Sequence, residues 1–230
     1  MTTASIAERP EGLSKATRGA AAATATASGA APATAAQQGL VPQMLNHLAY
    51  VTHDVAATAD FYTRILGMEL ASTIFDDHVP STGEDFPYFH IFFRMADGST
   101  IAFFECTDLP PPAKSSHPAY DTFNHVALQA QSPAEIRRWH AWLTQNGVAV
   151  IGPIDHKGMI ESIYFHDPNG IRLELTTPLD KEWNRHTDQG YADLKLWVET
   201  KESAKREGRD PGRALIDMIR ESKKRYAANA

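Results

Sequence analysis

The chain has 230 residues, of which 43% are hydrophobic, and a formal net charge of −6 at pH 7. This length and apolar content suit one domain of ordinary size with additional segments. The acidic balance argues against nucleic acid as a partner, and no apolar run is long enough to span a membrane. The single cysteine, Cys106, excludes an intramolecular disulfide framework and is expected to be a small core residue.

Residues 1–42 form an arm that differs in composition from the rest of the chain. The stretch 19–39 is rich in Ala and Thr, contains Gly and Pro, and has few large apolar side chains. Such a segment cannot bury enough surface to fold alone, so we predict that the arm is disordered. It lacks the Leu/Val-rich centre of a secretory signal, and we expect a cytoplasmic protein.

Two short stretches, "NHLA" and "NHVA", begin 78 positions apart and suggest an internal duplication. The alternation of apolar residues around each predicts a strand. Each strand is followed by a helix-starting residue, Asp54 or Ser132, and then by apolar residues at helical spacing. Each helix is expected to end near a glycine, Gly67 or Gly147, before further strands. The sequence therefore predicts that one strand–helix–strand unit occurs twice.

The closing strand of each unit carries one carboxylate inside an apolar run, Glu105 in the first unit and Glu174 in the second. A carboxylate at such a place is costly to bury without a partner. The opening strands contribute His47 and His125 at matching positions. Two histidines and two glutamates form a mixed nitrogen and oxygen set that suits a divalent metal. We therefore predict that these four side chains bind a metal ion.

Strand alternation also predicts the surroundings of this metal. The faces opposite the ligands, which are expected to include Ala102 and Phe104, should pack beneath the helices. A mostly apolar cleft with a few polar groups suits a small organic ligand rather than a large polyanion. Five side chains are expected to share the ligand faces and to contact the substrate: Val51, Ile101, Phe103, Gln129 and Arg172.

The stretches "NHLAYVTHDVAATADFYTRILGMEL", "NHVALQA" and "SIYFHDPNGIRLEL" resemble the vicinal oxygen chelate superfamily. Its members include glyoxalase I, extradiol dioxygenases, fosfomycin-resistance enzymes and bleomycin-resistance proteins. The resemblance implies an α+β domain over 43–178, built from two βαβββ modules (43–108 and 121–178) whose mixed sheets curl into a cleft. It implies that the cleft holds one divalent metal ion, Fe²⁺, Mn²⁺, Ni²⁺ or Zn²⁺, for a small-molecule substrate. A homodimer is expected, and the linker 108–121 is long enough for the cleft to close within one chain or between two subunits.

Three functions are compatible with this resemblance. The first is a glyoxalase-like lyase or isomerase reaction on a small vicinal-oxygen substrate, through a metal-stabilised enediolate with Glu174 or Glu105 as the base. The second is extradiol-type ring cleavage of a catechol by iron(II), with His47, His125 and Glu174 as a facial triad. The third is a metal-free, ligand-sequestering protein of the bleomycin-resistance type.

Two departures from the extradiol pattern favour the glyoxalase-like function. Extradiol enzymes usually carry an acid/base histidine near the start of the first module's last strand, where this chain has Ser99 and Thr100. In addition, a fourth ligand at Glu105 would crowd a facial triad. On the other side, Tyr164 stands where ring-cleavage enzymes keep a tyrosine, and it is a candidate catalytic residue.

The remaining segments carry weaker signals. The loop 75–90 is polar, contains Pro and Gly, and is expected to form a lid over the site. Histidines outside the ligand set, such as His78 and His156, are interpreted as surface or structural residues, although His90 and His166 could reach the cleft. Residues 179–230 are predicted to form amphipathic helices over 191–208 and 210–226, which pack on the domain or on a second subunit.

Overall fold

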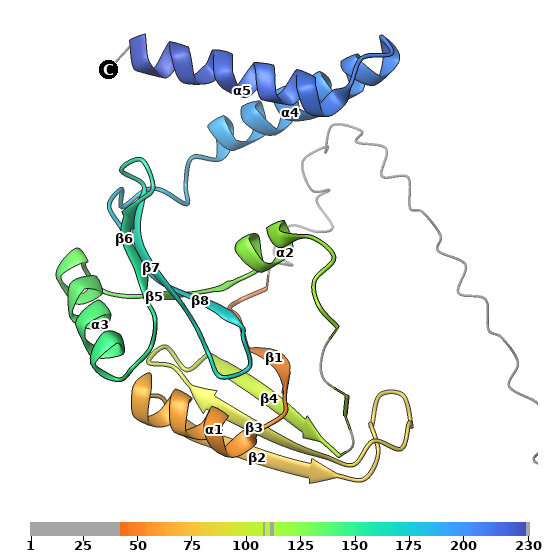
Figure 1. Ribbon diagram of the computed structural model, residues 1–230, viewed down its shortest axis with the longest axis vertical. Helices are drawn as coiled ribbons and strands as arrows, with labels where there is room; N and C mark the ends of the chain where they lie inside the picture. Colours follow the sequence, from red (N-terminus) through yellow and green to blue (C-terminus); the bar gives the residue numbers. More distant parts are fainter. Residues whose placement is uncertain (1–41, 108, 111–112, 229–230) are drawn as a thin grey trace, which may run out of the picture. The chain divides into compact units, whose positions relative to one another are not determined.

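The computed structural model describes residues 42–107, 109–110 and 113–228 (Figure 1). The predicted disorder of the N-terminal arm therefore concerns residues that lie almost entirely outside the described part. The described residues belong to two compact units, one that ends at Leu194 and one that begins at Lys195. No helix within these ranges is both long and apolar enough to cross a membrane.

The first module is a four-stranded sheet with one helical segment. Its strands are ordered β1-β4-β3-β2, with β1 parallel to β4 and the other neighbours antiparallel. Its elements are β1 (His47–Thr52), α1 (Val55–Asp60), the π-helical η2 (Phe61–Ile65), β2 (Glu69–Asp76), β3 (Tyr88–Arg94) and β4 (Thr100–Cys106).

The second module repeats this arrangement. Its strands are ordered β5-β8-β7-β6, again with the first strand parallel to the last one. The two βαβββ modules of the predicted α+β fold are thereby confirmed. The second set of elements is α2 (Pro118–Phe123), β5 (Val126–Gln129), α3 (Pro133–Gln145), β6 (Ile151–Asp155), β7 (Ile160–His166) and β8 (Arg172–Pro178).

The helices begin at the predicted capping residues. The Asp54 carboxylate accepts a hydrogen bond from the Ala57 amide at 2.9 Å, and the Ser132 hydroxyl accepts one from the Glu135 amide at 3.3 Å. Each cap satisfies an amide that has no partner inside the helix. The chain leaves α3 at Gly147, whose φ of 77° is costly for a residue with a Cβ atom.

One hydrophobic core joins the two modules. It lies on the helix-covered face of each sheet, with Tyr62 of η2 and Phe165 of β7 among its members. Burial along β5 shows the consequence, because Val126 and Leu128 are buried whereas Ala127 and Gln129 are exposed. The faces that carry the predicted histidine ligands are therefore the faces left outside the shared core.

The Asp-Pro-Asn-Gly turn between β7 and β8 connects the modules through hydrogen bonds. The Thr52 hydroxyl donates to Asn169 Oδ1 at 2.7 Å, and Asn169 Nδ2 donates to the Thr58 hydroxyl at 3.0 Å. The Tyr62 hydroxyl donates to Asp167 Oδ2 at 3.2 Å. Burial raises the pKa of Asp167, although backbone and side-chain donors partly offset this effect. The turn thus helps to fix one module on the other.

Replacing Tyr62 with phenylalanine is expected to destabilise the domain by about 1 kcal/mol, because one buried hydrogen bond to Asp167 is lost while the ring still fills the core. Urea unfolding at pH 7 measures the change. Tyr120→Phe, at an exposed tyrosine, is the control and should leave the free energy of unfolding unchanged. Equal losses in both variants would contradict a stabilising contact between the modules at Tyr62.

The C-terminal part of the chain forms two helices, α4 (Thr187–Arg206) and α5 (Pro211–Ala228). The first begins at Thr187 rather than at residue 191, and the chain leaves it through Gly208, whose φ is 67°. The carboxylate of Asp210 accepts a hydrogen bond from the Arg213 amide at 2.6 Å, as expected of a capping residue. The two predicted C-terminal helices are thereby confirmed.

Candidate metal centre

Two of the predicted ligands meet on the outer face of the second sheet. His125 directly precedes β5, and Glu174 lies in β8 opposite Ala127. The parallel pairing of β5 and β8 places both side chains on the same face, as the alternation predicted. His125 Nε2 lies 2.7 Å from Glu174 Oε2, and Glu174 is almost fully buried.

The protonation of His125 fixes what this pair can bind. His125 Nδ1 lies 2.8 Å from the carbonyl oxygen of Phe123, which only accepts hydrogen bonds, so Nδ1 carries a proton. In the neutral ring, Nε2 then presents a lone pair to Glu174 Oε2, and two acceptors at this distance require a proton or a cation between them. Glu174 Oε1 is buried and has no hydrogen-bond partner in the described part of the chain. This donor set fits a divalent metal ion.

Three further side chains surround this pair on the same face. Tyr164 lies opposite Glu174 across the β7–β8 pair, and its hydroxyl lies 3.0 Å from His156 Nε2. Burial, followed by the negative charge of Glu174, raises the pKa of Tyr164. The guanidinium carbon of Arg172 lies 4.3 Å from the centre of the Tyr164 ring. The pairing of Tyr164 with His156 was missed, because His156 lies in the β6–β7 hairpin and no sequence pattern connects the two.

His47 lies on the outer face of the first sheet and is exposed. Its Nδ1 lies 2.7 Å from Asn46 Oδ1, an acceptor, so Nδ1 carries a proton and Nε2 is free to bind a metal. Of the two repeated Asn-His dipeptides, only the first has an asparagine side chain that holds the neighbouring histidine ring. In the second module the corresponding acceptor is a backbone carbonyl rather than the side chain of Asn124.

Glu105 does not share a face with His47. The register of β1 with β4 pairs His47 with Thr100 and Thr52 with Glu105, so Glu105 lies on the helix-covered face of the sheet. Its Oε1 accepts a hydrogen bond from the Val55 amide at 3.1 Å, at the start of α1. An amide at a helix N-terminus favours a carboxylate. The prediction that Glu105 faces the metal cleft is wrong, and the helix start supplies the partner that the carboxylate needs.

The same register corrects the predicted lining of the first module. Ile101 and Phe103 share the face of Glu105 and are fully buried in the core, so they do not lie on the outer face, although Ile101 lines the pocket that also contains His125 and Gln129. Ala102 and Phe104, predicted to pack beneath the helices, lie instead on the face of His47. Because Ala49 pairs with Ala102 as Ala127 pairs with Glu174, the first-module counterpart of Glu174 is an alanine.

The other predicted substrate contacts are placed on the outer faces. Arg172 shares the face of Glu174, and its Nε is buried without a hydrogen-bond partner among the described residues. Gln129 and His125 line a pocket of about 380 Å³ together with Leu48 of β1. Val51 is exposed on the face of His47. The second module therefore keeps its predicted polar groups together.

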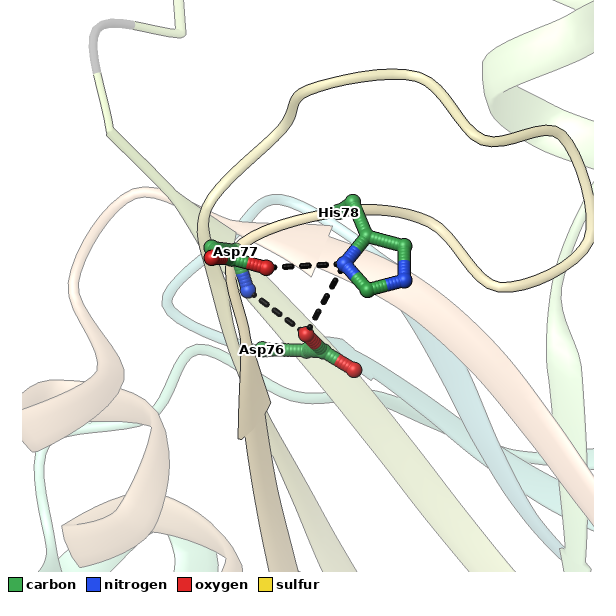
Figure 2. Close-up of side chains that lie close together, drawn as sticks. All are labelled: Asp76, Asp77 and His78. Carbon is green, nitrogen blue, oxygen red and sulfur yellow. Dashed lines mark hydrogen bonds and ion pairs between the residues drawn. The ribbon is translucent and has the colours of Figure 1, made fainter.

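Beyond the pair of His125 and Glu174, the described part of the chain does not bring a third predicted ligand into the same group. Within the described ranges, only one group of three or more His, Cys, Asp or Glu side chains has its donor atoms within 4.8 Å of one another, and it consists of Asp76, Asp77 and His78 (Figure 2). His78 Nδ1 lies 2.7 Å from Asp77 and 3.3 Å from Asp76. The hydrogen bond with Asp77 is the main cause that raises the pKa of His78. A protonated His78 satisfies both carboxylates, so this exposed trio behaves as an ion pair.

His90 is a buried imidazole on the face of His47. Its ring lies 3.6 Å from the Phe104 ring and 4.0 Å from the Phe92 ring, measured between centroids. Its Nε2 is buried and has no hydrogen-bond partner in the described part of the chain. Burial, followed by the positive charge of His47, lowers the pKa of His90 to about 4. His90 is therefore uncharged at neutral pH.

This low pKa predicts an acid-sensitive fold. The unfolded chain binds a proton at His90 near pH 6.5, whereas the folded chain binds it only near pH 4. The stabilisation is therefore complete above pH 6.5 and is lost as the pH falls toward 4. His90→Phe should flatten this decline in urea unfolding measured from pH 7 to pH 4.5. His166→Phe, at an exposed histidine, should leave the slope unchanged, and an unchanged slope in His90→Phe would contradict the assignment.

A family model and several known proteins are similar to this chain. The family model described as Glyoxalase/Bleomycin resistance protein/Dioxygenase superfamily matches residues 44–175. The metallothiol transferase FosB of Bacillus licheniformis is 28% identical over 134 residues, which cover 58% of this chain and 74% of that protein. A glyoxylase/bleomycin resistance protein/dioxygenase domain from Frankia sp. EAN1pec aligns at 15% identity with a TM-score of 0.49, covering 60% of this chain and 99% of that one. FosX, a fosfomycin resistance protein from Listeria monocytogenes, aligns at 22% identity with a TM-score of 0.46, covering 62% and 99%.

Proposed function

Because the chain belongs to the Glyoxalase/Bleomycin resistance protein/Dioxygenase superfamily, we propose that it is a divalent-metal-dependent enzyme with His47, His125 and Glu174 as metal ligands. The observation that carries this proposal is the pair formed by His125 and Glu174. His125 Nε2 faces a buried carboxylate oxygen at 2.7 Å, a distance that requires a proton or a cation between the two atoms, and the second carboxylate oxygen has no partner in the described ranges. A bound cation would satisfy both groups at once.

The third ligand comes, in this proposal, from a second copy of the chain. His47 is exposed and lies outside metal-binding distance of His125 and Glu174 in its own chain. The outer faces of both sheets are left uncovered by the shared core, and each holds part of the ligand set. A two-fold dimer that packs the outer face of one copy against that of another would complete two equivalent sites. The protein is therefore proposed to act as a homodimer.

Three protein ligands would leave room on a bound ion for two adjacent oxygens of a substrate. A bound metal would supply Lewis acidity and, as Fe²⁺, a site for O₂. The protein's own groups would manage the protons. A substrate hydroxyl beside Tyr164 can pass its proton to the Tyr164 oxygen while Tyr164 passes its own to His156 Nε2. Arg172 would hold the negative charge that remains on the substrate oxygen.

Among the reactions of this family, this arrangement best supports extradiol-type ring cleavage of a catechol by O₂, with Fe²⁺ as the metal. The glyoxalase-like alternative was based on four ligands, and Glu105 now lies on the other face of β4, where the register leaves Ala102 as the counterpart of Glu174. The two-histidine, one-carboxylate set that remains is typical of iron(II) oxygenases. The pair of Tyr164 and His156 offers an acid/base group in place of the missing histidine near Ser99 and Thr100.

A second candidate function is the metal-dependent addition of a thiol to a small electrophilic substrate. It is favoured by the 28% identity to the metallothiol transferase FosB over 134 residues. The same three ligands would serve, with the substrate oxygens bound to the metal and the thiol arriving from solution. This function would need no O₂, and Mn²⁺ or Zn²⁺ would replace Fe²⁺.

One assay panel separates these functions. The protein is purified without chelators, loaded anaerobically with Fe²⁺ or Mn²⁺, and given catechol, 3-methylcatechol or 2,3-dihydroxybiphenyl in an oxygen electrode. The proposal predicts O₂ uptake and a coloured ring-cleavage product with Fe²⁺ alone. Thiol consumption with fosfomycin and Mn²⁺, without O₂ uptake, would favour the second candidate. A protein that binds no metal at all would leave the ligand-sequestering function.

A further inference from the structure

An apolar pocket of about 600 Å³ lies on the face of His47, at the far end of the first sheet. It is lined by Val51 of β1, Phe104 of β4 and Tyr88 of β3. The loop between β2 and β3 contributes further lining residues, which include Pro80 and Phe86. We call this the apolar pocket. It has a volume typical of small-molecule sites.

No charged side chain lines the apolar pocket. Val51 is 46% exposed and Phe86 is 51% exposed, so large apolar side chains face water around it. Keeping such groups in water is unfavourable, and a rimmed apolar concavity of this kind marks a binding site. A charged ligand would lose its hydration there without gaining a partner. The fitting ligand is therefore uncharged and apolar.

The strand register connects the apolar pocket to the metal ligand in the same chain. Three successive rows of side chains cross β1, β4 and β3 on the outer face. The first contains His47, the second contains Ala49, Ala102 and Phe92, and the third contains Val51, Phe104 and His90. Ala102 is fully buried, whereas Ala49 is exposed and places only a small side chain between His47 and Val51 along β1. His47 and Val51 are four positions apart on this strand, which is about 13 Å.

We propose that the apolar pocket binds the apolar end of the substrate whose oxygen-bearing end reaches the metal. That the oxygen-bearing end binds the metal rests on the proposed function, whereas the binding of an apolar group in the apolar pocket does not. The substrate class is then a small molecule with two adjacent oxygens at one end and an uncharged hydrocarbon or aryl group on the order of 10 Å away. A simple catechol would leave the apolar pocket empty.

The environment of His90 supports the proposal that a ligand lies along these three rows. His90 belongs to the third row, because it pairs with Phe104, and its ring stacks on Phe104 at 3.6 Å. Its buried Nε2 has no hydrogen-bond partner in the described part of the chain. An unpaired polar atom buried in this way is destabilising unless something bonds to it. A polar atom of a ligand lying along the rows would supply this partner.

The test uses N-phenyl-1-naphthylamine, an uncharged fluorophore without oxygen atoms, added to the full-length, metal-free protein. Saturable fluorescence enhancement is expected for the wild type. Phe86→Ser should weaken binding about tenfold or more, because an aromatic wall is lost, and Phe86→Leu should largely restore it. Phe75→Ser is the matched control, since Phe75 is exposed and lines the neighbouring acidic pocket that contains Asp76 and Glu105. It should bind the fluorophore as the wild type does.

Cys106, the single cysteine of the chain, gives a second readout. It lines both the apolar pocket and the neighbouring acidic pocket, so its protection is compared between the two serine variants. The fluorophore should protect Cys106 from iodoacetamide in the wild type and in Phe75→Ser, but not in Phe86→Ser. Equal binding by both serine variants, or loss in Phe75→Ser alone, would overturn the proposal. A changed oligomeric mass in Phe86→Ser with unchanged binding would also overturn it, because Phe86 would then contact a second copy rather than the fluorophore. If the protein showed no ring-cleaving activity, the expected fluorophore binding would not change. The apolar pocket and the proposed function can therefore be disproved independently.

Discussion

Replacing Glu174 with glutamine is expected to lower the affinity for a divalent metal by more than about 100-fold, because a charged ligand becomes a neutral one. His125→Ala should have a similar effect. The metal-free fold should survive Glu174→Gln, since the change removes a buried charge and keeps the side-chain volume. Metal content after dialysis, measured by plasma mass spectrometry, gives the result, and circular dichroism checks the fold.

Glu105→Gln is the matched control for this experiment. The amide oxygen can still accept the hydrogen bond from the Val55 amide, so the start of α1 should be preserved. Because Glu105 lies on the face opposite His47, the variant should bind metal as the wild type does. Loss of metal in Glu105→Gln with retention in Glu174→Gln would return the site to the other face of β4 and contradict the assignment.

Mixing two inactive variants is expected to restore activity. His47→Ala and His125→Ala should each be inactive, since each lacks one ligand at every site. In an equal mixture that exchanges subunits freely, half of the dimers contain one chain of each kind. Each such dimer has one complete site, so the mixture should reach about a quarter of wild-type activity. Restoration requires that His47 and His125 of one site come from different chains.

The matched control is a mixture of His125→Ala with Glu174→Gln. Both changes affect the half of the site that one chain supplies, so no arrangement of these subunits creates a complete site. This mixture should stay inactive at every ratio. Recovery in the control as well, or no recovery in the first mixture after proven subunit exchange, would contradict a site shared between two copies.

The second module could be predicted well from the sequence. Alternation around His125 places Ala127 and Gln129 on its face, and this requires only the period of a strand. The Asp-Pro-Asn-Gly turn joins β7 directly to β8, so the facing of Tyr164 and Glu174 depends on a short hairpin. Local patterns of this kind also predicted the helix caps and the repeated βαβββ order. Each of these features is written within a few neighbouring residues.

The first module could not be predicted in the same way, because its register depends on strands far apart in the chain. β1 and β4 are separated by about fifty residues, and no local signal says that His47 pairs with Thr100. Matching Glu105 to Glu174 by sequence was wrong by three positions, since the structural counterpart is Ala102. An odd shift moves a side chain to the other face of the sheet. The hydrogen bond from the Val55 amide to Glu105, at the start of α1, could not be predicted from the sequence either.

The placement of both ligand-bearing faces outside the core also depends on tertiary packing. The residues that join the modules, such as Tyr62 with Asp167 and Thr52 with Asn169, lie more than a hundred positions apart. Sequence patterns predict that one face of each sheet is buried, but they do not predict which module packs against that face. The shared core on the helix side leaves the face of the proposed metal ligands uncovered, as the proposed dimer requires.

The most direct test of the shared metal site is a crystal structure of the protein grown with Mn²⁺, with anomalous difference density collected to locate the ion. A site shared between two copies should give one peak per chain, within about 2.3 Å of His125 Nε2 and a Glu174 oxygen, and of Nε2 of His47 from a second copy. A peak beside Glu105, or at the exposed trio of Asp76, Asp77 and His78 alone, would contradict it.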